Sequence, residues 1–303
     1  MPAKIISLFL VMLLVFSMAA AAAEDAAITV TDMDGRVITF DEPVTRIVAL
    51  TPSDCEILCA IGCGDMLVGR GEFCDWPESI LDLPALATGE NTNVEEVLAL
   101  EPQAVLVSDA HGDDTQIRML EANGVKVVIS DSTDIAGVYT SIRLIGAITG
   151  RDAEAEEVIA DMQATFDAIS DRAEDSGRTI YFEVMPLEWG LWCAGSSTFM
   201  HEIAHICGME NAFADIDGWQ PVSEEQVMER NPDYIVLVTG MGDTAVDEVM
   251  GRAGWGDITA VMNGAVYNAD SYEMTRPGPR LKDAAIDLYN FLYGDDFTGT
   301  DAE

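Results

Sequence analysis

Two of the three histidines in this 303-residue chain belong to one short motif, His201-Glu202-Ile203-Ala204-His205. On a helix, the H-E-x-x-H spacing places two imidazoles on the same face, where they can bind zinc. The glutamate between them can then activate a zinc-bound water for hydrolysis. Glu225 lies twenty residues after His205 and could supply a third ligand. One hypothesis is therefore a secreted zinc metallopeptidase that uses His201, His205 and Glu225.

The surroundings of this motif favour a site without catalysis. Apolar side chains cover one broad face of the expected helix, and both histidines fall on the opposite face, where solvent is expected. The helix ends at Gly208, and the flanking alternation of strands and helices is not typical of a peptidase. The sequence also contains no G-x-S-x-G or P-loop motif, so esterase and nucleotidase chemistry lack support. We therefore expect no enzyme, with the peptidase kept as the alternative.

Six cysteines could also carry chemistry. Six cysteines allow fifteen pairings, so their spacing leaves any disulfide connectivity open. Cys55, Cys59 and Cys63 recur every four residues on one helical face, whereas Cys193 and Cys207 flank a different helix. The sequence has no C-x-x-C pair, so a cysteine zinc cluster is poorly supported. Either several cysteines are small buried apolar residues, or one or two disulfides form in an exported chain.

A targeting signal occupies the first residues. Lys4 gives a positive start, an apolar run follows to Met18, and three alanines precede Glu24. This order is typical of a cleaved secretory signal, so residues 1–23 are excluded from the fold. We expect the mature chain to be exported to a periplasmic or extracellular location.

The charge balance excludes one class of partner. Lysine and arginine number 15 against 54 aspartates and glutamates, which gives a net charge of −39. Such a surface repels nucleic acid and anionic membranes, so neither is expected as a partner.

Strand-like and helix-like runs alternate along the chain. Buried strands are expected at Arg46–Leu50, Ala104–Val107 and Val125–Ile129, with helices between them. Ser53 is expected to cap the helix after the first strand, with Glu56 three residues on. This β-α-β-α order predicts a parallel sheet covered by helices.

A long segment from Asp152 to Glu174 has apolar residues at helical spacing and contains no proline or glycine, which predicts one rigid helix. The strand–helix pattern restarts after it. The expected fold class is therefore α/β, with two Rossmann-like lobes of parallel sheets joined by that helix. We expect the domains to be a first lobe at 24–150, the linking helix at 151–176, a second lobe at 177–294 and a disordered tail at 295–303.

One segment occurs twice, 130 residues apart. Asn93 and Ser223 are cap residues, each followed by glutamate two residues later, and each copy has a proline before a buried strand. Glu95 and Glu225 therefore occupy the second position of matching helices, one per lobe. They could simply complement the helix dipole. A partner that straddles both lobes could also bind this pair.

Together these features resemble the periplasmic cobalamin- and ferric-siderophore-binding proteins of ABC importers. The resemblance covers about Thr29 to Tyr293 and implies two α/β lobes, a ligand cleft between them, and one surface glutamate per lobe that meets arginines of the permease. Those glutamates correspond to Glu95 and Glu225. The segments that carry the resemblance are Thr31-Asp32-Met33-Asp34-Gly35-Arg36, Arg46-Ile47-Val48-Ala49-Leu50, Cys74-Asp75-Trp76-Pro77, the two repeated segments, Gly208-Met209-Glu210-Asn211 and Arg276-Pro277-Gly278-Pro279-Arg280.

A metal chelate is a broad, partly apolar disc with a polar edge, so its cleft needs aromatic faces and a few placed polar groups. Loops that follow strands supply them. Arg276 matches a family position that contacts ligand, whereas Arg280 is expected to anchor its loop by an ion pair. The ligand-binding candidates are Pro52, Ser53, Phe73, Cys74, Asp75, Trp76, Asp109 and His111 in the first lobe, and Trp189, Trp192, Trp219, Tyr272 and Arg276 in the second.

The chain departs from the cobalamin binders at two places. Gly89 stands where they carry a tryptophan, and Ser108 or Asp109 replaces a second aromatic residue. A ferric siderophore or haem is therefore as well supported as cobalamin. A binder of a free metal ion would need several ligands between the lobes, where only His111 lies. We expect a monomer without a cofactor, whose partners are the chelate and the permease.

Overall fold

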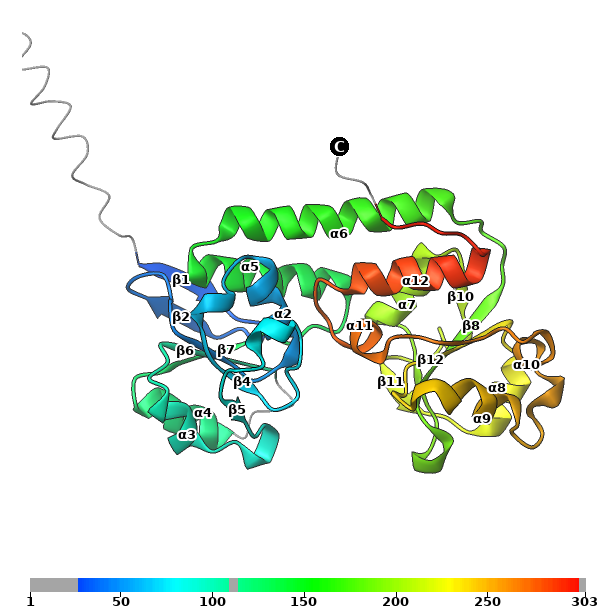
Figure 1. Cartoon of the computed structure of the whole chain (residues 1–303), viewed down its shortest axis with the longest axis horizontal. Coiled ribbons are helices and arrows are strands. Elements are labelled where there is room, and N and C mark those ends of the chain that lie inside the picture. Colours follow the sequence, from blue (N-terminus) through cyan, green and yellow to red (C-terminus); the bar gives the residue numbers. More distant parts are fainter. Residues whose placement is uncertain (1–26, 109–113, 300–303) are drawn as a thin grey trace, which may run out of the picture.

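The computed structural model describes residues 27–108 and 114–299 as two α/β lobes joined by one long helix, α6 (Asp152–Arg172) (Figure 1). The sequence predicted this helix to continue to Glu174. It stops two residues earlier because Ala173 adopts extended backbone, with ψ at 140°. The α/β fold of two lobes on one helix is confirmed, whereas residues 1–23, the expected signal, lie outside the described residues.

The first lobe is built on a five-stranded sheet of order β5-β4-β3-β6-β7 in which every neighbouring pair is parallel. The central strand β3 is buried along its whole length, as its apolar sequence predicted. A separate antiparallel hairpin, β1–β2, precedes the sheet. The strands of this lobe are β1 (Ile28–Thr31), β2 (Val37–Phe40), β3 (Ile47–Ala49), β4 (Leu67–Gly71), β5 (Ala85–Leu86), β6 (Ala104–Val107) and β7 (Lys126–Ile129).

Asn93 and Asp134 cap two helices of this lobe, and the sequence prediction for a third helix needs correction. Asp134 caps α5 as expected, and its side chain accepts a hydrogen bond from the Gly137 amide at 2.6 Å. Ser53 does not cap α2, because the helix already begins at Pro52, a residue suited to the first helical position. The helices are α2 (Pro52–Ala60), α3 (Val94–Ala99), α4 (Asp114–Ala122) and α5 (Ile135–Thr149), with 3-10 turns at Gly64–Met66, Glu78–Ile80 and Gly89–Asn91.

The sheet of the second lobe is mixed rather than wholly parallel. Its order is β11-β9-β8-β12-β13, and β10 also pairs with β8. The strands β10, β12 and β13 run parallel to β8, but β9 is antiparallel to both β8 and β11. The link from β8 to β9 is too short for a parallel crossover. The strands are β8 (Thr179–Met185), β9 (Trp192–Ala194), β10 (Glu210–Asn211), β11 (Trp219–Pro221), β12 (Tyr234–Leu237) and β13 (Val266–Asn268).

In the second lobe, Ser223 and Gln226 form the predicted capping box at the start of α8. Beyond the last helix, Asn290 exchanges two hydrogen bonds with Phe297, which holds part of the expected tail against the fold. The helices are α7 (Phe199–Ile206), α8 (Glu224–Arg230), α9 (Ala245–Met250), α10 (Thr259–Asn263), α11 (Ser271–Thr275) and α12 (Leu281–Tyr293), with 3-10 turns at Leu187–Trp189, Gly242–Thr244 and Trp255–Asp257.

One apolar core runs from the first lobe into the second beneath α6. Ile145 of α5, Met162 of α6 and Phe199 of α7 all belong to it and are buried. Two backbone amides also bond between the lobes near this core. The Phe199 amide donates to the Thr133 carbonyl at 2.8 Å, and the Ile135 amide donates to Glu202 at 2.6 Å. Because packing and hydrogen bonds both cross the joint, the lobes are held firmly together at the end nearest α6.

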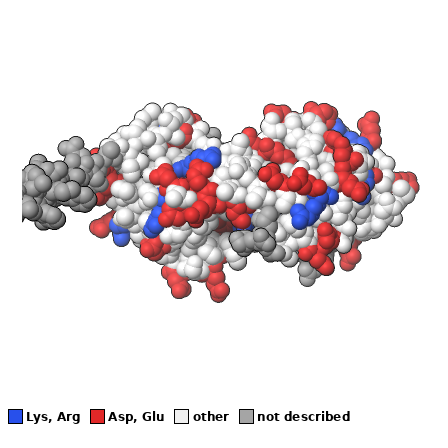
Figure 2. Space-filling view, turned by 90° about the horizontal axis from the view of Figure 1, so that it is seen from above, with Lys and Arg blue, Asp and Glu red and all other residues white. Residues whose placement is uncertain are grey.

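The surface is acidic on both lobes. Figure 2 views the molecule from the side of α6 and shows red carboxylate side chains over both lobes, with basic side chains in a few small groups. None of the helices in the described part of the chain is both long and apolar enough to cross a membrane.

Candidate ligand-binding cleft

Two adjoining hollows lie where the carboxyl ends of both sheets face each other. The first, of about 370 Å³, is lined from the first lobe by Ser53 and Ser130 and from the second by Arg276. The second, of about 430 Å³, lies in the second lobe along the loop that follows β12. Tyr272 and Thr275 line both hollows, so the two hollows lie next to each other, and together they are called the cleft. Ligands of open α/β sheets bind at this edge.

Buried charges bridge the cleft behind these hollows. Glu56 of α2 accepts hydrogen bonds from Arg276 Nη1 at 3.1 Å and from Arg280 Nη2 at 2.8 Å and Nε at 3.0 Å. The side chains of Glu56 and Arg276 are only 2% and 9% exposed. Arg280 thus makes the ion pair expected from the sequence, although its partner belongs to the other lobe. Because the two arginines approach from the second lobe, this network fixes the distance between the lobes.

Arg276 also holds the loop that follows β4. Its Nη1 lies 2.7 Å from Asp75 Oδ1, and its Nη2 donates to the Phe73 carbonyl at 3.2 Å. The guanidinium lies 4.3 Å from the ring centre of Tyr272, a cation–π contact. The Asp75 side chain is 43% exposed, so it is the partner of Arg276 that solvent or a ligand can reach.

A buried carboxyl group lies beneath the first hollow. Asp54 accepts hydrogen bonds from Thr51 Oγ1 and, at 2.5 Å, from Ser130 Oγ. Burial raises the pKa of Asp54 to about 6, against the lowering effect of these two hydroxyl groups. Asp54 therefore links α2 to the end of β7 and helps to shape the floor of the cleft.

Three aromatic side chains near the charge network are exposed, and of these Tyr272 lines both hollows. Phe73 is 64% exposed, Trp76 48% and Tyr272 53%, although residues of this size are usually more buried. Arg280 lies 4.9 Å from the Trp76 ring centre, and Arg276 contacts the backbone of Phe73, so both rings come from the loop that borders the charge network. Pro52 and Ser53 line the first hollow, as their position after β3 predicted.

The structure places other sequence candidates away from these hollows. Cys74 is fully buried, with its thiol directed at the Ala49 carbonyl rather than into the cleft. Trp192 and Trp219 lie half-buried on the neighbouring strands β9 and β11, where the Trp219 ring packs on Phe199 at 5.5 Å between centres. Asp109 and His111 lie outside the described residues.

Sequence reasoning overlooked several polar residues that line the first hollow. Ser130 and Asp131 directly follow β7, and Thr51 is the second residue after β3. Both strands were expected, so the rule that ligands meet the carboxyl ends of strands could have identified these three residues. Thr275, at the end of the short helix α11, offered no comparable signal.

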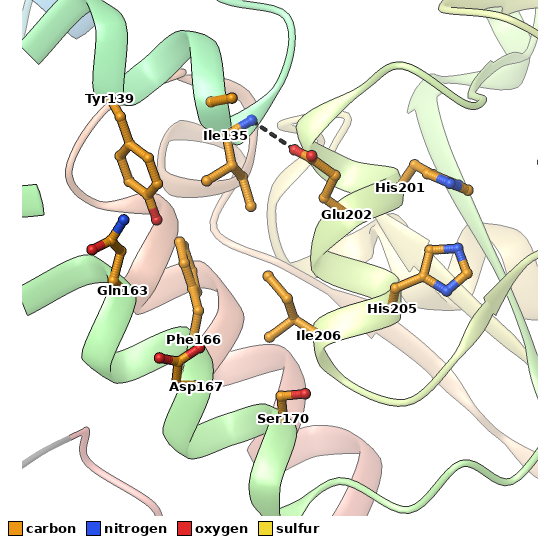
Figure 3. Close-up of a pocket in the computed structure, with 11 residues that line it drawn as sticks. Ile135, Tyr139, Gln163, Phe166, Asp167, Ser170, His201, Glu202, His205 and Ile206 are labelled. Atoms are coloured by element: carbon orange, nitrogen blue, oxygen red, sulfur yellow. Dashed lines mark hydrogen bonds between the residues drawn. The ribbon is translucent and has the colours of Figure 1, made fainter. Parts of the chain in front are cut away.

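The H-E-x-x-H segment forms α7, but its side chains do not assemble a zinc site. In Figure 3, Glu202 points toward the Ile135 amide while His201 and His205 project from the other side of the helix. The imidazole centres lie 4.5 Å apart, edge to face, and burial lowers the pKa of His201. Within residues 27–108 and 114–299, no three His, Cys, Asp or Glu side chains could hold a metal ion. His201, His205 and Glu225 thus do not come together as one metal site in the described part of the chain, and zinc binding by this motif stays an untested alternative.

A third pocket, of about 920 Å³, lies between α5, α6 and α7 (Figure 3). Phe166 and Tyr139 face it, and burial raises the pKa of Tyr139 to about 12. This groove lies at the joint between the lobes, beside the Glu202–Ile135 hydrogen bond, and is separate from the cleft.

Glu95 and Glu225 are both exposed at the second position of their helices, α3 and α8. The two helices lie at the side of the molecule away from α6 (Figure 1). A hydrogen bond from its own backbone amide and one from Ser223 lower the pKa of Glu225 below its ordinary value.

Comparison with known proteins supports the family resemblance. The model of a family described as periplasmic binding protein matches residues 47–273. The chain is 31% identical over 277 residues to the uncharacterized ABC transporter substrate-binding lipoprotein YvrC of Bacillus subtilis, with 89% of this chain and 87% of that one covered. It is 30% identical over 196 residues to the vitamin B12-binding protein of Yersinia pestis, covering 63% and 69% of the two chains.

A solved structure gives the same result. The possible iron-binding (periplasmic solute-binding) protein of Staphylococcus epidermidis superposes with a TM-score of 0.75 at 27% identity, covering 83% of this chain and all of that one. These relatives are binding proteins, which confirms the expectation that the chain is not an enzyme. The chain belongs to the periplasmic binding protein family.

Proposed function

We propose that this protein captures a metal chelate, such as a ferric siderophore, cobalamin or haem, in the cleft between its lobes and delivers it to the permease of an ABC importer. One observation carries the proposal. Exposed aromatic rings from both lobes, Trp76 and Tyr272, lie beside the two arginines that bridge the cleft. A flat apolar ligand with polar edge groups needs such surroundings.

The relatives agree with this ligand class, since one is named as a vitamin B12-binding protein and another as a possible iron-binding protein. Pro52, Ser53, Phe73 and the two rings named above would contact the ligand. Arg276 would bind its polar edge, because a carboxylate of the chelate can replace the exposed Asp75 while Glu56 keeps the guanidinium in place. Cys74 would support the binding loop from below, and roles in ligand contact for Trp192, Trp219 and Asp109 remain part of the proposal.

The proposal is tested by titrating the protein with cyanocobalamin, haemin and ferric siderophores while its tryptophan fluorescence is recorded. One of these chelates should quench the emission saturably, with a dissociation constant in the micromolar range or below. Tyr272→Ala should weaken that affinity at least tenfold, because it removes a ring from the wall of both hollows. Val37→Ala serves as the matched control, since Val37 is 71% exposed on the distant hairpin.

Two results would count against the proposal. The first is the absence of saturable quenching with every chelate tested. The second is equal loss of affinity in Tyr272→Ala and Val37→Ala, which would place the ligand elsewhere.

Delivery would depend on Glu95 and Glu225, one on each lobe. Two exposed carboxylates on the same side of the molecule suit a permease with basic residues above both of its halves. In this proposal the exported protein is a monomer that associates with the cell surface through the permease.

A further inference from the structure

Two of the six cysteines lie side by side in the first lobe. The Sγ atoms of Cys55 and Cys74 are 3.7 and 3.9 Å from the same acceptor, the Ala49 carbonyl oxygen, and both residues are completely buried. All six cysteines of the structure are free thiols. The shared acceptor brings these two sulfurs together although nineteen positions separate them in the sequence.

We propose that Cys55 and Cys74 form a disulfide in the exported protein. The two thiols would lose two electrons and two protons to a disulfide-bearing oxidant, either a low-molecular-weight disulfide or an oxidised dithiol protein. A thiolate of one cysteine attacks the oxidant and releases one thiol. The second cysteine then attacks the mixed disulfide and releases the other, which leaves one new S–S bond.

Because both thiols are buried in the folded lobe, the disulfide would have to form before folding is complete. The Cys55 thiol is hydrogen-bonded to the Cys74 thiol and is buried, and both effects raise the pKa of Cys55 well above its ordinary value. A protonated, inaccessible thiol reacts slowly, so oxidation belongs to the folding stage after export, before the lobe closes over the pair. The finished bond would then be shielded from reductants for the same reason.

The bond would join two elements of the cleft. Cys55 lies on α2, next to Asp54 and Glu56, while Cys74 lies in the loop between Phe73 and Asp75. Locking this loop to α2 would restrict the backbone that presents Phe73 and the Asp75 carboxylate to Arg276. The inference does not depend on which ligand the cleft takes.

The remaining cysteines offer internal comparisons. Cys207 is buried with its thiol on the Ala285 carbonyl, and Cys193 is buried in the core of the second lobe. Neither shares an acceptor with another sulfur among the described contacts. Cys59 lies on α2, whereas Cys63 lies three residues beyond the end of that helix and not on one helical face with Cys55 and Cys59 as the sequence predicted; these two are the competing pair.

The test uses the full protein recovered from an exporting host. It is denatured in N-ethylmaleimide, and intact mass and peptide mapping count the labelled thiols. Four labelled cysteines and one cross-linked peptide joining Cys55 to Cys74 are expected. Six labelled cysteines, or a cross-link that involves Cys59 or Cys63, would overturn the proposal.

A second measurement uses reduction and exchange. Dithiothreitol should cleave the bond slowly in native buffer and at least tenfold faster in urea. Amide hydrogen exchange in residues 72–77 should increase in Cys55→Ser, with Cys193→Ser as the matched control that leaves this loop unchanged. Equal exchange in the two variants, or equally fast reduction of native and unfolded protein, would contradict the proposed clamp.

Discussion

Glu56 and Arg276 meet across the cleft from different lobes, with Oε1 and Nη1 3.1 Å apart and both side chains almost fully buried. Arg280 completes the arrangement by pairing with the same carboxylate at 2.8 Å. Glu56 is therefore the carboxylate that both arginines share, while Asp75 and Glu273 each pair with one of them. The ion pairs of Glu56 with the two arginines therefore join the lobes and also border the candidate site.

Glu56→Gln should lower the free energy of unfolding by about 3 kcal/mol, because it leaves two poorly solvated guanidinium groups without their full counter-charge. Urea denaturation followed by circular dichroism measures this change. Glu156→Gln is the control, since its ion pair with Arg143 is about half exposed and should contribute little to stability. A similar loss in both variants would show that burial does not distinguish the two ion pairs.

Asp54 should make stability depend on pH. Its pKa is raised from 3.8 to about 6 in the folded protein, so the fold favours the protonated form. The stabilisation is complete below pH 3.8 and is lost as the pH rises through 6, with a total of about 3 kcal/mol. Asp54→Asn lacks this loss, so its stability relative to the wild type should increase between pH 4 and 7. Parallel stability curves for the two proteins would contradict the assignment.

Glu202 should stabilise the joint between the lobes without any role for zinc. Glu202→Ala removes the acceptor of the Ile135 amide and should cost about 1–2 kcal/mol of unfolding free energy. Glu202→Gln keeps a side-chain oxygen there and should lose less than half as much. Zinc content, measured by mass spectrometry of the purified protein, should be equally low in all three. Stoichiometric zinc in the wild type alone would restore the metal hypothesis.

Glu95→Ala combined with Glu225→Ala should abolish uptake of the bound chelate and leave its affinity unchanged. Both carboxylates are exposed, so the substitutions remove charge without disturbing the core. The matched control replaces Glu96 and Glu229, two exposed glutamates on the same helices. Uptake into cells or vesicles that carry the permease is the measurement. If the control pair reduced uptake equally, general surface charge rather than these two positions would explain docking.

Local sequence patterns predicted the framework well. The helix α6 was identifiable because twenty-one residues without glycine or proline carry apolar side chains at helical spacing. Buried strands such as β3 and β6 were identifiable as short apolar runs. Both patterns depend only on residues that are close in the sequence, so they can be recognised without knowledge of the tertiary structure.

The candidate site was harder to predict because its key contacts join distant parts of the chain. Glu56 appeared to be the partner of a helix cap at Ser53, yet it binds Arg276, which lies 220 residues away. Pro52 at the first position of α2 was the available signal against that cap. The antiparallel strand β9 and the proximity of Cys55 to Cys74 likewise arise only when the sheets are assembled.

Because α6 shares one apolar core with both lobes, we expect the width of the cleft to change little when a ligand binds. A ligand thicker than the cleft would then be excluded, because the two lobes would not move apart to admit it. Release of the ligand would then require the permease to separate the lobes, which means breaking the ion pairs of Glu56 with Arg276 and Arg280. Both the selection of ligands and their release would therefore depend on the rigidity of the joint between the lobes.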